Sequence, residues 1–176
     1  MKGQNALFSH KGDEWQTPQW LFDQLDREFH FQVDVAATQE NTLCIGYYTK
    51  TTDALNGDWI SDDYDEDDVA ISNGIDRFFC NPPYSKIAAF MKKAYEESLK
   101  GATVVCLIPC RTDTRYWHDY CMKASEIRLI KGRLKFTNHT IEKTSSATFP
   151  SCIVVFDERM TRMSTPYPVL YSMVKD

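Results

Sequence analysis

The sequence predicts an α/β fold in which a mostly parallel sheet carries helices on both faces. Short apolar runs alternate along the chain with segments whose apolar residues recur at helical spacing. The run at 103–109 is dominated by apolar and β-branched residues, as expected of a strand buried on both faces of a parallel sheet. No internal repeat or linker interrupts this pattern, and 43% of the 176 residues are hydrophobic. We therefore expect one domain over residues 1–176.

The first half of the chain is expected to form one helix and three or four short strands. Thr17-Pro18 is a favourable helix start, with Thr17 as N-cap, and the helix should cover residues 18–28. Strands are expected at 31–37, around 44–48, at 69–71 and at 77–80. The strand at 31–37 contains an acid followed by small residues, which suits a strand end that meets a ligand.

The second half continues the alternation of helices and strands. Gly101 should end a helix whose apolar face is Ile87, Phe90, Met91, Ala94 and Leu99. A central strand at 103–109 is followed by a helix that Asp113 caps and that bears Trp117, Tyr120, Cys121 and Ala124. Further strands are expected at 126–130 and 152–156, separated by a polar, basic stretch.

The segment Asn81-Pro82-Pro83-Tyr84 lies between the strand at 77–80 and a helix for which Ser85 is the expected N-cap. Open α/β sheets bind ligands at such strand-to-helix turns. The prolines fix φ and remove two donors, so the Asn81 side chain and a backbone carbonyl converge. Two acceptors suit a planar amino group such as N6 of adenine, because they stabilise its positive charge during attack on an electrophile. Tyr84 can stack on the ring.

So weak a nucleophile requires a strongly activated methyl donor, and S-adenosylmethionine is one. Asp34 at a strand end can accept hydrogen bonds from the donor, and Ala36 and Ala37 allow close approach to the backbone. A plain strand-terminating acid is the alternative for Asp34. Further candidate contacts are Asp53 as a second acid, Trp59 as a ring for adenine, and the helix start at Gln16, Thr17 and Pro18 for the donor carboxylate.

The charge of the chain is divided unevenly. Residues 1–68 contain 4 Lys or Arg and 15 Asp or Glu, a balance of −11, whereas residues 69–176 contain 16 and 10, a balance of +6. The basic half is compatible with a phosphate-backbone partner. Its candidate contacts are Arg111 and Arg115 after the strand at 103–109, and Lys131, Arg133 and Lys135, which would share one face of a strand. Tyr116, Phe136 and His139 are candidates to fill the gap left by a flipped base.

Cysteines and histidines indicate neither disulfides nor a metal site. The six cysteines contain no C-x-x-C pair, and the four histidines have no ligand spacing. No apolar run reaches the length of a membrane span, and the first residues are polar, so a cytoplasmic protein is expected.

Over about residues 15–157 the sequence resembles the phage-encoded DNA N6-adenine methyltransferases of the Dam type. The shared order is Trp15-Gln16-Thr17-Pro18, Asp34-x-Ala36-Ala37, Asp53-x-Leu55 with Trp59, Asn81-Pro82-Pro83-Tyr84, the Pro109 strand end and Gly132-Arg133-x-x-Phe136. The resemblance implies a Rossmann-like methyltransferase fold, S-adenosylmethionine as donor and adenine in double-stranded DNA as acceptor. It places catalysis at Asn81 to Tyr84 and the donor near Gln16, Asp34 and Asp53. The chain has no separate target-recognition domain, so loops are expected to give sequence specificity.

Other functions remain open at this point. The same chemistry suits cytosine N4, an RNA base or a glutamine amide, and a non-enzymatic nucleic-acid binder could retain the fold. The tetrapeptide does not separate these substrates. The charge division favours nucleic acid, and the resemblance favours DNA.

Overall fold

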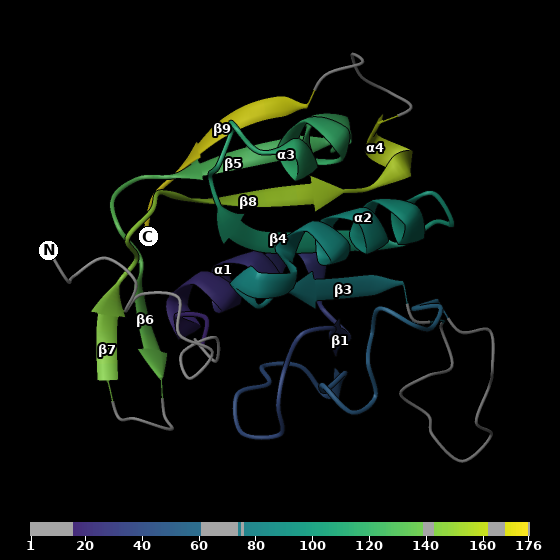
Figure 1. Cartoon of the computed structure of the whole chain (residues 1–176), viewed down its shortest axis with the longest axis horizontal. Helices are drawn as coiled ribbons and strands as arrows, with labels where there is room; N and C mark the ends of the chain where they lie inside the picture. Colours follow the sequence, from purple (N-terminus) through teal and green to yellow (C-terminus); the bar gives the residue numbers. More distant parts are fainter. Residues whose placement is uncertain (1–15, 61–73, 75, 139–142, 162–167, 176) are drawn as a thin grey trace, which may run out of the picture.

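A seven-stranded mixed sheet forms the centre of the molecule (Figure 1). The computed structural model describes residues 16–60, 74, 76–138, 143–161 and 168–175. The strand order is β2-β1-β3-β4-β8-β5-β9, and within the described residues only β8 runs antiparallel to its neighbours. The strands are β1 (Val33–Asp34), β2 (Gly46–Tyr47), β3 (Arg77–Cys80), β4 (Thr103–Pro109), β5 (Glu126–Ile130), β8 (Ser151–Phe156) and β9 (Val169–Met173).

Helices cover both faces of this sheet, as the sequence predicts. The helical segments are α1 (Gln19–Phe29), η2 (Tyr84–Lys86), α2 (Ile87–Ser98), α3 (Arg115–Asp119), η3 (Cys121–Lys123) and α4 (Glu158–Thr161). Successive strand residues point to opposite faces. Phe78 accordingly packs in the core under α2 and α3, whereas Phe79 packs in the core under α1. The sheet therefore has one hydrophobic core on each face, and each core includes residues of β3, β4 and β8.

Most expected strands are present, and three have the expected bounds: β3, β4 and β5. β8 gains one residue at Ser151. β1 and β2 are only two residues long. Val35 and Ala36 form a turn directly after β1, in which the Ala36 N–H donates to Asp34 Oδ1. The strand expected at 69–71 lies outside the described residues.

The basic stretch after β5 does not form the single strand that was expected. Lys131 and Gly132 form a bend, with Gly132 at φ 87°, and the chain leaves the sheet there. β6 (Lys135–Asn138) then pairs with β7 (Lys143–Ser146) in a separate antiparallel ribbon that projects beside the sheet in Figure 1. The prediction that Lys131 shares a strand face with Arg133 and Lys135 is therefore wrong.

The three expected N-terminal helix caps, Thr17, Ser85 and Asp113, are wrong. Pro18, not Thr17, precedes α1. The Pro83 carbonyl accepts the Lys86 N–H at 2.9 Å, which closes the 3-10 turn η2 around Ser85, so α2 begins later. Thr114 rather than Asp113 precedes α3, which ends at Asp119. Leu99 lies beyond α2 and is 52% exposed instead of part of its apolar face.

The strand order creates one switch point. After β1 the chain pairs β2 on one side of it and then returns to pair β3 on the other. The loops that leave β1 and β3 therefore run in opposite directions across the end of the sheet. Open α/β sheets bind ligands in the crevice between two such loops. We call this end of the sheet, where β1 to β5 finish, the carboxyl edge.

Candidate active site

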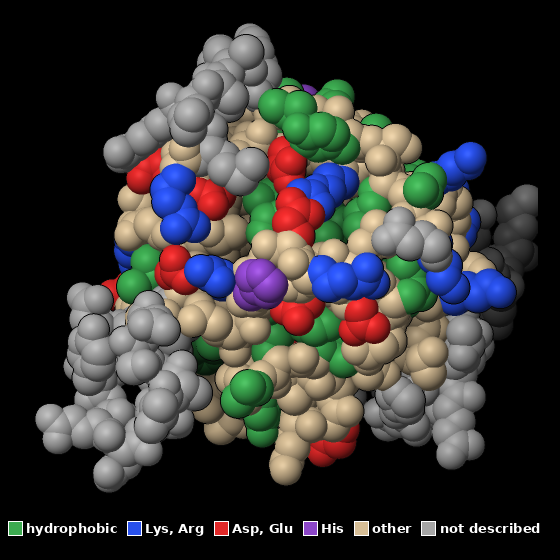
Figure 2. All heavy atoms as spheres, turned by 180° about the vertical axis from the view of Figure 1, so that it is seen from behind, with side chains coloured by type: hydrophobic (Ala, Val, Ile, Leu, Met, Phe, Trp, Pro, Cys, Tyr) green, Lys and Arg blue, Asp and Glu red, His purple; other side chains and the backbone are tan. Residues whose placement is uncertain are grey.

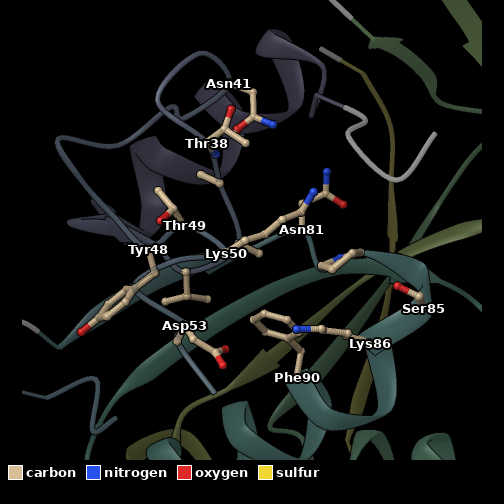
Figure 3. A pocket seen from close by; sticks show the side chains of 15 residues that line it. Thr38, Asn41, Tyr48, Thr49, Lys50, Asp53, Asn81, Ser85, Lys86 and Phe90 are labelled. Atoms are coloured by element: carbon tan, nitrogen blue, oxygen red, sulfur yellow. Dashed lines mark hydrogen bonds between the residues drawn. The ribbon is translucent and has the colours of Figure 1, made fainter. Parts of the chain in front are cut away.

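A cavity of about 290 Å³ opens at the carboxyl edge above β1 and β3 (Figure 3). Its volume is close to the lower end of the roughly 300–1,000 Å³ typical of small-molecule sites. The lining residues follow β1 and β2 or belong to the turn after β3 and the start of α2: Val35, Ala36, Ala37, Thr38, Asn41, Tyr48, Thr49, Lys50, Asp53, Ala54, Asn81, Pro83, Ser85, Lys86 and Phe90. The structure thus brings Ala36, Ala37 and Asp53 together with Asn81 and Pro83.

Asn81 is the first residue after β3, and a hydrogen bond fixes its side chain. Its Nδ2 donates to Thr17 Oγ1 at 3.1 Å. Because an amide carries its oxygen opposite its nitrogen, Oδ1 is turned away from Thr17. The Pro83 carbonyl accepts the Lys86 N–H, whereas no backbone N–H from the described turns and loops donates to the Pro82 carbonyl. The Asn81 side-chain oxygen and the Pro82 carbonyl are the candidate acceptors in this turn.

Asp34 lies behind the cavity wall and is 5% exposed. Its Oδ1 accepts the N–H of Ala36 at 3.1 Å, and no Lys or Arg in the described part of the chain pairs with it. Burial raises the pKa of Asp34 to about 7, against the opposing effect of the Ala36 hydrogen bond. A cationic group near Ala36 would therefore be stabilised by this carboxylate.

Asp53 also lines the cavity and has a left-handed backbone conformation, with φ 37° (Figure 3). Its carboxylate accepts the Leu55 N–H at 3.3 Å and the Asn56 Nδ2 at 2.7 Å. These two bonds hold the acid in place at the cavity.

Trp59 does not fit the expected role of a ring that stacks on a ligand. It is 1% exposed and packs against Phe78, with ring centroids 5.5 Å apart. Its Nε1 donates to the carbonyl of Ala54, a cavity residue, at 2.6 Å. Trp59 therefore supports the wall from the core side. The sequence did not predict this role, because an aromatic residue after a loop can be buried in the core or exposed to a ligand.

The remaining residues expected near the donor or the base lie beside the cavity and do not line it. Gln16, Thr17 and Pro18 lead into α1, and the Gln16 N–H donates to the Thr137 carbonyl at 2.9 Å. Tyr84 is half-buried in η2. Trp15 lies outside the described residues.

Some cavity residues carried no usable signal in the sequence. Asn41, Tyr48, Lys50 and Lys86 all line the cavity but belong to no recognisable motif. Only their places after expected strands or at the start of an expected helix hinted at the site.

The expected DNA contacts lie in the loops at the carboxyl edge. Arg111 follows β4, and its guanidinium lies 4.2 Å from the Phe149 ring centroid. Arg115 begins α3 and is exposed, as are Lys131, Arg133 and Lys135 after β5. On the opposite view, Figure 2 shows basic and acidic side chains interspersed over the described surface, without a continuous basic field.

Two of the three residues expected to fill the gap of a flipped base are core residues instead. Tyr116, on α3, is 7% exposed and packs into the core that α2 and α3 cover, and Phe136 is 5% exposed and packs with the core under α1. Neither can enter a base stack without unfolding its surroundings, so these two predictions are wrong. His139 lies outside the described residues.

In the described part of the chain, no three His, Cys, Asp or Glu side chains are grouped to hold a metal ion. All six cysteines are free, and Cys44 and Cys110 are half-buried while the other four are buried. No described helix combines the length and apolar character needed to cross a bilayer.

A mixed sheet with a cavity at its switch point defines the class of α/β proteins that bind a small molecule at the carboxyl edge. Within this class, the chain belongs to the DNA N-6-adenine-methyltransferase (Dam) family, which it matches over residues 4–175. It is 30% identical over 154 residues to the DNA N-6-adenine-methyltransferase of Haemophilus phage HP1 (strain HP1c1), covering 84% of this chain and 80% of that protein. The enzyme of the same name from Escherichia phage T1 is 27% identical over 123 residues, or 69% of this chain and 46% of that protein. These matches confirm the resemblance noted in the sequence.

Proposed function

We propose that the chain transfers the methyl group of S-adenosylmethionine to N6 of adenine in double-stranded DNA. Membership of the family supports the reaction and the substrate. The observation that carries the mechanism is the place of Asn81, whose oriented amide lines the same cavity as Ala36, Ala37 and Asp53. The strand order, with β8 antiparallel, is compatible with a Rossmann-like methyltransferase fold in one domain.

The residues of the cavity fit S-adenosylmethionine, which supplies an electrophilic methyl group on a positively charged sulfur. Asp34 is a buried carboxylate with one backbone hydrogen bond, so a cationic amino group near Ala36 would stabilise its ionised form. Ala36 and Ala37 leave room for close approach, and Asp53 offers an anchored acceptor to a ribose hydroxyl.

For the acceptor, Asn81 Oδ1 and the Pro82 carbonyl would accept the two hydrogens of the adenine amino group. As the nitrogen attacks the methyl carbon it gains positive charge, which these two acceptors stabilise. The proton can leave after transfer, so no general base is required. Tyr84, in the same turn, would stack on the flipped base and hold its ring.

For DNA, the basic residues at the carboxyl edge would contact phosphates: Arg111, Arg115, Lys131, Arg133 and Lys135. The β6–β7 ribbon has the two-stranded form that a major groove admits, and it leaves the sheet at the same edge. We infer that these loops provide the sequence specificity, on DNA in the host cytoplasm.

The test is radiolabelled methyl transfer to plasmid DNA and to RNA, followed by nucleoside analysis of the product. The wild-type protein should form N6-methyladenine in DNA. Asn81→Ala should lower turnover about a hundredfold or more, because it removes a hydrogen bond that strengthens in the transition state, while donor affinity and melting temperature change little. Comparable turnover by the variant would remove Asn81 from the mechanism. If methylated cytosine, RNA or protein were the main product, the assignment of adenine in DNA as the substrate would be wrong.

A further inference from the structure

The Thr17 hydroxyl does not cap the helix that follows it. Thr17-Pro18 precedes α1, but Pro18 occupies the cap position and no side chain caps the helix. The Thr17 side chain, which is 6% exposed, instead accepts the Asn81 Nδ2 hydrogen bond at 3.1 Å. A hydroxyl that would ordinarily serve a helix therefore serves a side chain 64 positions away in the sequence.

The backbone around Thr17 is fixed on both sides. The preceding residue, Gln16, donates its N–H to the Thr137 carbonyl of β6 at 2.9 Å. The following residue, Pro18, has its φ locked at −57°, and its carbonyl accepts the N–H groups of Leu21 and Phe22 in α1. The hydroxyl thus has little freedom to leave Asn81.

An asparagine amide has two orientations that differ by a half turn and have nearly the same shape. In one, Oδ1 faces the target amine and can accept its hydrogen. In the other orientation, Nδ2 faces the target amine, and no hydrogen bond can form because both groups are donors. A threonine hydroxyl can accept from Nδ2 or donate to Oδ1, and in the structure it accepts from Nδ2. We propose that Thr17 is a positioning residue for the reaction, whose hydroxyl restrains the Asn81 side chain in the place and orientation that the structure shows. The inference rests on the proposed function of Asn81.

Thr17→Val keeps the size of the side chain and removes the hydroxyl, whereas Thr17→Ser keeps the hydroxyl. Loss of one hydrogen bond should lower the single-turnover rate of methyl transfer to plasmid DNA about tenfold in Thr17→Val. Donor affinity by calorimetry should stay within about twofold, and Thr17→Ser should restore the rate to within about threefold of wild type. Thr17→Ala gives the same comparison if the valine variant does not fold.

Thr103→Val is the matched control. Thr103 is also a buried threonine, 4% exposed, but its hydroxyl bonds Asp157 and Arg159 at the amino end of β4. This variant should have a lower melting temperature than wild type, and the folded protein should keep the wild-type rate of methyl transfer. A folded Thr17→Val protein with a normal rate would overturn the proposal. If its donor affinity were weakened at the same time, Thr17 would be assigned to the donor site instead. An inactive wild type would instead refute the proposed function, and an Asn81→Ala arm run in parallel shows which of the two has failed.

Discussion

At the scale of single residues, Asp34 combines a cost in stability with a use in binding. Its pKa rises from 3.8 to about 7 because burial disfavours the charged form, so the folded protein binds this proton more tightly than the unfolded chain does. Stability therefore falls as the pH rises from about 4 to about 7, and the loss is complete above pH 7. A ligand cation at Ala36 would offset that loss.

Asp34→Asn should separate the two effects. The neutral amide removes the buried charge, so the variant should gain up to about 4 kcal/mol of unfolding free energy at pH 8 and little at pH 4. Donor binding should become undetectable. Urea denaturation at both pH values and calorimetry of the donor measure these quantities. Equal pH dependence of stability in variant and wild type would show that Asp34 does not titrate as described.

Tyr84 is predicted to act through its ring. Tyr84→Ala should weaken binding of DNA with a flipped adenine by about 1–3 kcal/mol, because a stacking partner is lost. Tyr84→Phe should bind and turn over nearly as wild type, since the ring remains. Fluorescence of a 2-aminopurine placed at the target base reports flipping in each variant. An effect of Phe as large as that of Ala would assign the role to the hydroxyl.

At the scale of elements, α2 braces the cavity wall through Glu97. Glu97 is fully buried, accepts hydrogen bonds from Lys93 and Lys100 on its own side of the fold, and accepts the backbone N–H of Trp59 at 3.2 Å. Burial alone would raise the pKa of Glu97, but the two lysines outweigh it and lower that pKa. The stabilisation is thus present above the ordinary pKa and is lost as the pH falls through the lowered value.

Glu97→Gln should lower the unfolding free energy by about 1–3 kcal/mol at pH 7, because charge-assisted bonds to both lysines weaken inside the fold. Its neighbour Glu96 forms only a partly exposed pair with Lys92 on the same helix, so Glu96→Gln should cost less than about 1 kcal/mol. Chemical denaturation of both variants gives the comparison. Similar losses would mean that the Trp59 segment does not depend on Glu97.

The elements also show how far the sequence could predict the structure. Strands such as β4 carry their own signal, since a buried run of apolar and β-branched residues has few other uses. The Asn81 turn was recognisable because its chemistry and its place after a strand agreed. For Thr17 the sequence predicted a helix cap and a place near the donor carboxylate, and it gave no sign of a contact with Asn81. Only the tertiary fold brings its hydroxyl to Asn81.

At the scale of the whole molecule, the basic loops should make DNA binding sensitive to salt. Replacing both Arg133 and Lys135 with alanine should flatten the log–log dependence of affinity on salt by up to about two units, with similar effects on all sequences. Arg77→Ala with Lys92→Ala removes the same charge away from the carboxyl edge and should leave the slope nearly unchanged. Affinity that ignores both salt and these cations would contradict DNA as the partner.

The residues that line the cavity lie between Val35 and Phe90, whereas the proposed phosphate contacts and the β6–β7 ribbon lie between positions 111 and 146. The second stretch packs against the rest of the fold, because Trp117 shares a core with Phe90 and the Thr137 carbonyl accepts the Gln16 N–H. An exchange of this stretch that keeps these contacts leaves the cavity residues themselves unchanged. Recombination between related phages within this interval would yield an enzyme with an inherited chemistry and a new methylation site. A hybrid carrying residues 111–146 of a relative should accordingly keep the donor affinity of this protein and methylate the sites of the other.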